Sequence, residues 1–147
     1  MKMNNVRLQR NLTLPNDVET IPQLNEFVEL ACEEIGFDMS STMSLVLAIE
    51  EAVVNVMSYA YPEGTEGSVD INIIADDVNA IFIISDNGKP FDPTARGEVD
   101  TTLPADKRPI GGLGIHLMRQ IMDDVSYERK ENMNVLTLSK TINNNNQ

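Results

Sequence analysis

Two polar side chains interrupt an apolar stretch of the sequence at a spacing that suits chemistry. Glu51 and Asn55 stand four residues apart, and their neighbours Leu47, Ala48 and Val54 are apolar. Residues four apart project from one face of a helix, so a carboxylate and an amide oxygen would lie side by side. Such a pair can hold Mg²⁺ and orient a nucleophile. The same spacing is also common in polar pairs that face solvent, and both interpretations stay open.

A third carboxylate, Glu50, adjoins this pair in the sequence. Consecutive residues of a helix are rotated by about 100° from one another, so Glu50 projects from a different part of the helix surface than Glu51. We expect Glu50 to be solvated and the chemistry to belong to Glu51.

The segment DNGKPFD, Asp86 to Asp92, directly follows an apolar run that predicts a strand. A carboxylate buried at the end of a strand can accept a hydrogen bond from an exocyclic amine. Gly88 has no side chain, so a flat ring can pack against its backbone. Asp-Asn-Gly is also ordinary turn chemistry, which is the alternative interpretation.

A cluster of three glycines, Gly111, Gly112 and Gly114, lies in the segment GGLGIHL and begins a predicted helix. Glycines at a helix N-terminus let backbone N–H groups approach phosphate oxygens, and the helix end supplies partial positive charge. Helix caps and hinges use the same residues. The segment is not a dinucleotide-binding fingerprint, because no strand precedes it and Leu117 stands where that motif needs glycine.

Composition and charge exclude several classes of protein. The 147 residues suit one domain, and 11 basic against 23 acidic side chains give a net charge of −12, which disfavours direct binding to nucleic acid. One cysteine, Cys32, and one histidine, His116, support neither a disulfide scaffold nor a zinc site. Without an apolar run of ~20 residues or an apolar targeting segment, we expect a cytoplasmic protein with no membrane span.

The elements that must position these residues follow from hydrophobic periodicity. Alternation predicts a strand from Val6 to Leu14, and helical spacing predicts a helix from about Pro22 to Gly36, with Asn16 and Glu19 as its capping box. A second helix, from about Ser40 to Ala60, is apolar around almost its whole circumference. We expect this helix to be buried on most sides.

The rest of the chain predicts strands joined in hairpins and one more helix, which begins at Gly112. The further strands are expected at residues 69–75, 80–85, 125–130 and 135–141. Because hairpins make antiparallel pairs, the predicted fold is an α/β (α+β) two-layer sandwich. Its sheet is mostly antiparallel and mixed, and three helices cover one face of it.

Residues 1–142 are expected to form a single domain, followed by a polar tail at residues 143–147. Residues 93–110 contain three prolines, a glycine and mixed charges without a sustained period. A connector of this length is unusual in so small a domain. We interpret it as a mobile lid that ends at the glycine cluster.

Taken together and in this order, the three motifs resemble those of the GHKL family of ATP-binding domains, over roughly Leu8 to Ile142. The segment from Glu51 to Asn55 looks like the N box of that family, DNGKPFD like its first glycine box and GGLGIHL like its second. Many members carry a second glycine where Pro90 stands. Pro-Phe-Asp at this point is similar to the branch of anti-sigma factor serine kinases. The resemblance implies the Bergerat fold.

The same resemblance implies a role for each candidate residue. Asn55 would ligate Mg²⁺, Glu51 would act as general base and Asp86 would contact the adenine amine. The glycines would line the nucleotide: Gly88 at the adenine, and Gly111, Gly112 and Gly114 at the phosphates. ATP and Mg²⁺ are therefore the expected cofactors.

The function implied is that of an ATP- and Mg²⁺-dependent serine/threonine protein kinase. It would phosphorylate a STAS-type anti-sigma antagonist and alternately sequester a sigma factor, and it would form a homodimer. A sensor histidine kinase is disfavoured because His116 lies inside the second glycine box. The alternative is a non-catalytic module whose bound ATP selects a conformation for binding a partner protein.

Overall fold

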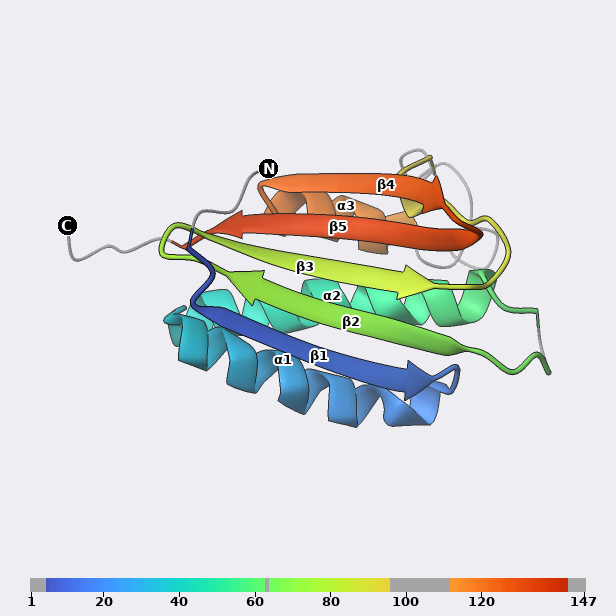
Figure 1. Ribbon diagram of the computed structural model, residues 1–147, viewed down its shortest axis with the longest axis horizontal. Helices are drawn as coiled ribbons and strands as arrows, with labels where there is room; N and C mark the ends of the chain where they lie inside the picture. The colour runs from blue at the N-terminus through green and yellow to red at the C-terminus, as the bar shows by residue number, and fades with distance from the viewer. Residues whose placement is uncertain (1–4, 63, 96–111, 143–147) are drawn as a thin grey trace.

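The computed structural model describes residues 5–62, 64–95 and 112–142, and in these residues one open sheet carries helices on a single face (Figure 1). The elements are, in chain order, β1 (Leu8–Pro15), the 3₁₀ helix η1 (Val18–Thr20), α1 (Ile21–Ile35), α2 (Met39–Tyr59), β2 (Ser68–Ala75), β3 (Asn79–Asp86), the 3₁₀ helix η2 (Pro93–Ala95), α3 (Gly112–Ile121), β4 (Asp124–Lys130) and β5 (Met133–Thr141). The strand order is β1-β2-β3-β5-β4. The predicted two-layer fold is confirmed, and the described strands pair only in antiparallel fashion rather than in a mixed sheet.

Local signals set the ends of the two long helices. Gly36 ends α1 with a φ of 109°, in the left-handed region that favours glycine. Asp38 caps α2 through its side chain. The predicted capping box of Asn16 and Glu19 is wrong. Asp17 takes the capping role instead. Its Oδ1 accepts the hydrogen bond of the Glu19 N–H, two residues further on, at 2.9 Å, and so caps the first turn of η1.

Helix α2 lies in the middle of the helical layer, packed against both α1 and α3 (Figure 1). Ile49 and Val53 are fully buried in the shared core. The prediction of burial on most sides is confirmed for the C-terminal half of the helix. In the N-terminal half, Met39, Met43 and Leu47 are exposed.

By length and composition alone, α2 is also long and apolar enough to cross a membrane. Its position accounts for that composition, since a helix with neighbours on both flanks and a sheet beneath it needs apolar side chains on several faces. We therefore regard α2 as the core helix of this domain.

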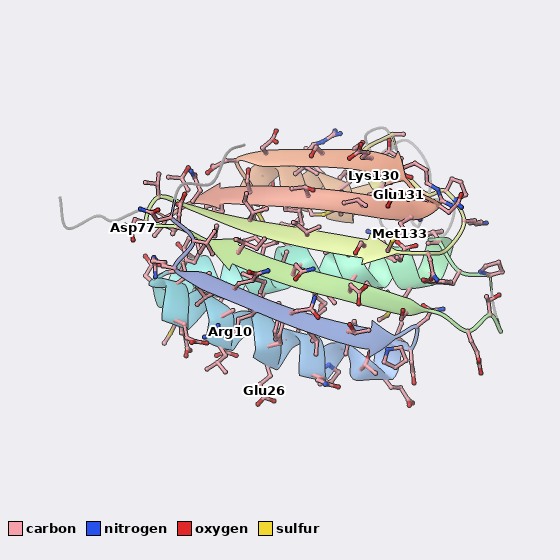
Figure 2. The ribbon with its side chains drawn as sticks, in the orientation of Figure 1. Arg10, Glu26, Asp77, Lys130, Glu131 and Met133 are labelled. Atoms are coloured by element: carbon pink, nitrogen blue, oxygen red, sulfur yellow. The ribbon has the colours of Figure 1, made fainter. Side chains whose placement is uncertain are left out.

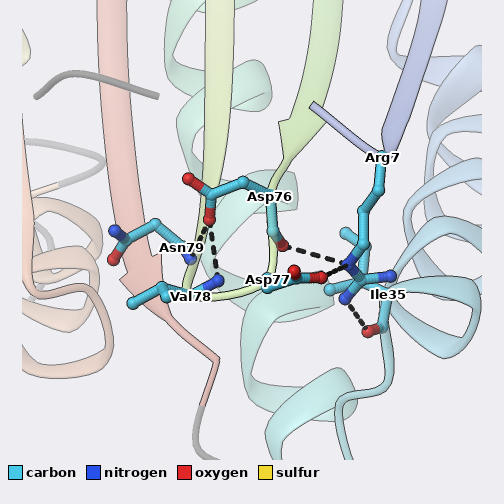
Figure 3. Close-up of polar contacts among 6 residues, drawn as sticks. All are labelled: Arg7, Ile35, Asp76, Asp77, Val78 and Asn79. Atoms are coloured by element: carbon cyan, nitrogen blue, oxygen red, sulfur yellow. Dashed lines mark hydrogen bonds and ion pairs between the residues drawn. The ribbon is translucent and has the colours of Figure 1, made fainter. Parts of the chain in front are cut away.

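At one end of the molecule, Arg7, which precedes β1, forms hydrogen bonds with two other segments (Figure 3). Its Nη2 donates to the carbonyl oxygen of Ile35 at 2.6 Å, and its Nε donates to the carbonyl oxygen of Asp76 at 3.1 Å. Asp77 lies 3.3 Å from the same Nε. The Asp76 carboxylate itself accepts from the N–H groups of the next turn residues. Arg7 therefore joins the end of α1 to the β2–β3 turn.

We predict that Arg7→Ala lowers the free energy of unfolding by about 1 to 2 kcal/mol, because two main-chain carbonyls lose a charged donor. Urea denaturation measures this change. Arg10→Ala is the matched control: Arg10 pairs with Glu34 at 2.8 Å on the surface, and an exposed pair contributes roughly 0 to 1 kcal/mol. Equal losses in the two variants would contradict the role given to Arg7.

Candidate functional site

The carboxylate predicted to recognise an amine lies at the end of β3. Asp86 is 2% exposed. Its Oδ1 accepts hydrogen bonds from the N–H of Gly88 and from Nδ2 of Asn134, each at 2.9 Å. Its Oδ2 is buried and has no hydrogen-bond partner among the described residues. A buried oxygen without a partner costs free energy, which a donor on a ligand would recover.

Burial raises the pKa of Asp86 above the ordinary aspartate value. The hydrogen bonds from Asn134 and Gly88 and the charge of Arg129 act in the opposite direction but do not outweigh desolvation. The contact between Asp86 and the Gly88 N–H is also the turn that Asp-Asn-Gly predicts, so the turn interpretation and the site interpretation are compatible.

Gly88 lies against the end of α2, where a side chain has no room. A Cβ at this position would be 2.4 Å from the carbonyl oxygen of Ala60. The next residue, Lys89, donates its N–H to that same oxygen at 2.8 Å. The ring of Phe91 stacks on Tyr59, the last residue of α2, with centroids 5.4 Å apart. The loop after β3 is thus fixed to the helix that carries Glu51 and Asn55.

On α2 the two predicted residues differ in environment. Asn55 is 3% exposed, so the solvent-facing alternative is wrong for it, whereas Glu51 is half-buried. The expectation that Glu50 is solvated is also wrong. Glu50 is half-buried and accepts a hydrogen bond from Nδ2 of Asn25 at 2.8 Å, because α1 packs alongside α2 at this point.

The glycine cluster is described in part. Gly112 and Gly114 lie in the first turn of α3, as predicted, and Gly111 lies outside the described residues. So does most of the predicted lid, of which only η2 is described. The carbonyl oxygen of Thr94 in η2 accepts a hydrogen bond from Arg119 of α3 at 3.0 Å. The N-terminus of α3 and the end of β3 lie at the same end of the sheet (Figure 1).

Sequence reasoning missed Asn134, which it assigned to a hairpin turn. This residue is 3% exposed at the start of β5, directly opposite Asp86 in the strand register. Its turn, marked by Lys130 and Glu131 in Figure 2, lies at the same end of the sheet as the end of β3. Arg129 of the same hairpin donates to the carbonyl oxygen of Gly88 at 2.9 Å. Only strand pairing could have revealed these contacts.

Several known proteins are similar to this chain. Serine/threonine-protein kinase BtrW of Bordetella bronchiseptica is 31% identical over 96 residues, which are 65% of this chain and 68% of the relative. Serine-protein kinase RsbW of Listeria monocytogenes is 28% identical over 134 residues, covering 84% of this chain and 85% of the relative. RsbW of Halalkalibacterium halodurans is 29% identical over 134 residues, covering 83% and 80%.

A solved structure shares the fold. The crystal structure of the RsbU and RsbW domains of Rv1364c from Mycobacterium tuberculosis superposes with a TM-score of 0.65 at 16% sequence identity. The match covers 90% of this chain and 32% of that one, so this chain spans about a third of its length. The predicted fold type is confirmed by this neighbour.

A family model described as the histidine kinase-like ATPase domain matches residues 14–140, which include α2, the loop after β3 and α3. This agrees with the resemblance drawn from the three motifs, and the relatives named as serine kinases agree with the predicted branch. The chain belongs to the histidine kinase-like ATPase domain family.

Proposed function

We propose that this protein is an ATP-dependent serine/threonine protein kinase of the anti-sigma factor type. The observation that carries the proposal is the buried Oδ2 of Asp86, which has no hydrogen-bond partner among the described residues and lies beside a glycine packed against a helix end. An adenine base presents an amine donor that suits this acceptor. Relatives named as protein serine kinases, matched over most of this chain, support the same activity.

Each predicted site residue keeps its proposed role. Asp86 accepts from the adenine amine, and Gly88, whose lack of a side chain lets the loop pack on Ala60, presents its backbone to the ring. Gly111, Gly112 and Gly114 offer backbone N–H groups to the phosphates at the N-terminus of α3. Residues 93–110 serve as the lid.

Asn55 is proposed as the protein ligand of Mg²⁺. In the described part of the chain no three His, Cys, Asp or Glu side chains cluster as a metal site would require. A cation held by one amide oxygen and by phosphate oxygens fits this composition, because Mg²⁺ commonly binds few protein groups together with phosphates and water. The metal would neutralise charge that develops on the transferred phosphoryl group.

Glu51 is proposed as the general base. It would take the proton of an incoming serine hydroxyl while the serine oxygen bonds to the γ-phosphorus and the bond to the ADP oxygen breaks. The position of Glu51 supports this role. Its side chain is half-buried on α2, one turn from the buried Asn55, so part of it is accessible to a protein substrate.

The proposed substrate is a STAS-type anti-sigma antagonist, and the second partner is a sigma factor that the protein sequesters in the cytoplasm. The competing function is a non-catalytic ATP-binding module. Transfer of labelled phosphate from ATP to a candidate antagonist distinguishes the two, because only a kinase produces the phosphoprotein.

We also propose a homodimer, formed through the face of the sheet that no described helix covers. This face carries Ile74, Ile81, Ile83 and Val135, which alternate along their strands with core residues under the helices. Apolar side chains gathered on an open face are typical of protein interfaces. A second copy suits the centre of this face, because Ile83 lies between Asn72 and Thr137, which carry no charge that would repel its counterpart. The charged neighbours Glu128 and Asp124 lie on β4, at the edge of the sheet.

We predict that Asp86→Ala weakens ATP binding by ~10- to 150-fold, since a desolvated hydrogen bond to a charged group contributes roughly 1.5 to 3 kcal/mol. The unmodified protein should prefer ATP to GTP, because guanine carries a carbonyl where adenine carries its amine. Calorimetry measures both affinities. Equal affinity for ATP and GTP would contradict the role of Asp86.

We predict that Glu51→Gln keeps ATP affinity within about threefold while phosphotransfer falls by ~100-fold or more, because the base acts in the transition state. Glu50→Gln is the matched control: a glutamine keeps the acceptor for Asn25, so its turnover should be unchanged. A catalytic loss in Glu50→Gln instead would mean that the assignment of these two residues is reversed.

We predict that Ile83→Lys shifts the protein toward monomer in sedimentation velocity, because a charge would be buried at the centre of the proposed interface. Val78→Lys changes an exposed valine in the β2–β3 turn and should leave the association state as it is. A dimer that withstands the change at Ile83 would place the interface elsewhere.

A further inference from the structure

The side chain of Asn134 uses all of its hydrogen-bonding groups. Its Nδ2 donates to Asp86 Oδ1 at 2.9 Å and to the carbonyl oxygen of Lys89 at 2.8 Å. Its Oδ1 accepts from the N–H of Phe91 at 3.0 Å and from the hydroxyl of Tyr127. Two pure acceptors on one side and a main-chain donor on the other permit only one orientation of the amide.

This orientation of the Asn134 amide determines which carboxylate oxygen of Asp86 is left for a ligand. Two donors, the Asn134 amide and the Gly88 N–H, converge on Oδ1, whereas Oδ2 accepts no hydrogen bond from the described residues. Both donors stabilise the ionised form of the Asp86 carboxyl group. A proton on Oδ1 would face these two donors instead of an acceptor. The carboxylate can therefore rotate or change its role only by breaking both hydrogen bonds.

The Asn134 amide also holds in place the loop after β3, which is the loop proposed to contact the adenine ring. Through Lys89 and Phe91 it contacts main-chain groups on both sides of Pro90, and Arg129 of the same hairpin contacts Gly88. A loop that packs on α2 at Ala60 is thus held from its other side by the β4–β5 hairpin.

We propose that Asn134 is a positioning residue that sets the base preference of the site: it keeps Oδ2 of Asp86 as an acceptor and so favours a 6-aminopurine over a 6-oxopurine. The inference rests on the proposed function, because it requires that Asp86 meets the base. A positioning role differs from a purely structural one in one respect: substitution of Asn134 must change how much the 6-amino group of the ligand contributes to affinity.

The test is a cycle between one side chain and one ligand group. Asn134→Asp keeps the size and the acceptor for Phe91 but replaces the donor to Asp86 with an oxygen. Affinities for ATP and for purine riboside triphosphate, which lacks the 6-amino group, are measured by calorimetry in both proteins. Asn132→Asp, the same change at an exposed position in the turn of the same hairpin, is the control.

We expect the unmodified protein to bind ATP about 10-fold or more tightly than the purine analogue, and Asn134→Asp to lose most of that ratio, as expected for loss of a charge-assisted hydrogen bond. The control should retain the ratio. If the unmodified protein does not distinguish the two ligands, the proposed role of Asp86 fails. If it does and Asn134→Asp distinguishes them equally well, the positioning role is overturned.

A second variant keeps the inference testable if Asn134→Asp does not fold, which circular dichroism would reveal. In Asp86→Asn the two donors at the Oδ1 position would hold the new amide oxygen there, so its NH₂ would replace Oδ2. A donor at that place should shift the preference from ATP toward inosine triphosphate by ~10-fold or more. An unchanged ratio of the two affinities would overturn the inference.

Discussion

The burial of the Asp86 carboxylate is the constraint that the surrounding elements satisfy together. A carboxylate removed from water must be hydrogen-bonded, and the donors to its Oδ1 come from two different parts of the chain. The Gly88 N–H is in place because the loop packs without a side chain against Ala60, at the end of α2. The Asn134 amide is in place because β5 pairs with β3 in a register that sets the two residues opposite one another.

The two ends of the domain differ in whether their polar groups have hydrogen-bond partners. At one end, Arg7 and the Asp76 turn satisfy main-chain carbonyls and N–H groups with partners from three segments, which stabilises the fold. At the other end, one buried oxygen of Asp86 has no partner in the part of the chain that the structure describes, and desolvation raises the pKa of Asp86. An oxygen left in this state lowers stability and is available to a ligand, a combination that functional sites commonly show.

Helix α2 connects the core to the candidate site. The residues that make it apolar, such as Ile49 and Val53, bury it between α1, α3 and the sheet. Asn55 and Glu51 are therefore carried by the helix that packs against both α1 and α3, and its C-terminal end contacts the loop that follows Asp86. Positions on such a helix are held to small displacements, which suits a site that must orient reacting groups.

The strands, the three α-helices, the helix-covered sheet and the three motifs were predictable from the amino-acid sequence, because periodicity, turn residues and glycines act over a few neighbouring residues. For the same reason it placed Asp86 and Gly88 at the end of a strand and Asn55 on a helix. The contacts between distant segments were not predictable from local patterns: Asn134 opposite Asp86, Glu50 paired with Asn25, and Arg7 joined to the ends of α1 and β2. These depend on strand register and on helix packing angles. Both are set by the simultaneous fit of all side chains in the core, which no local pattern encodes.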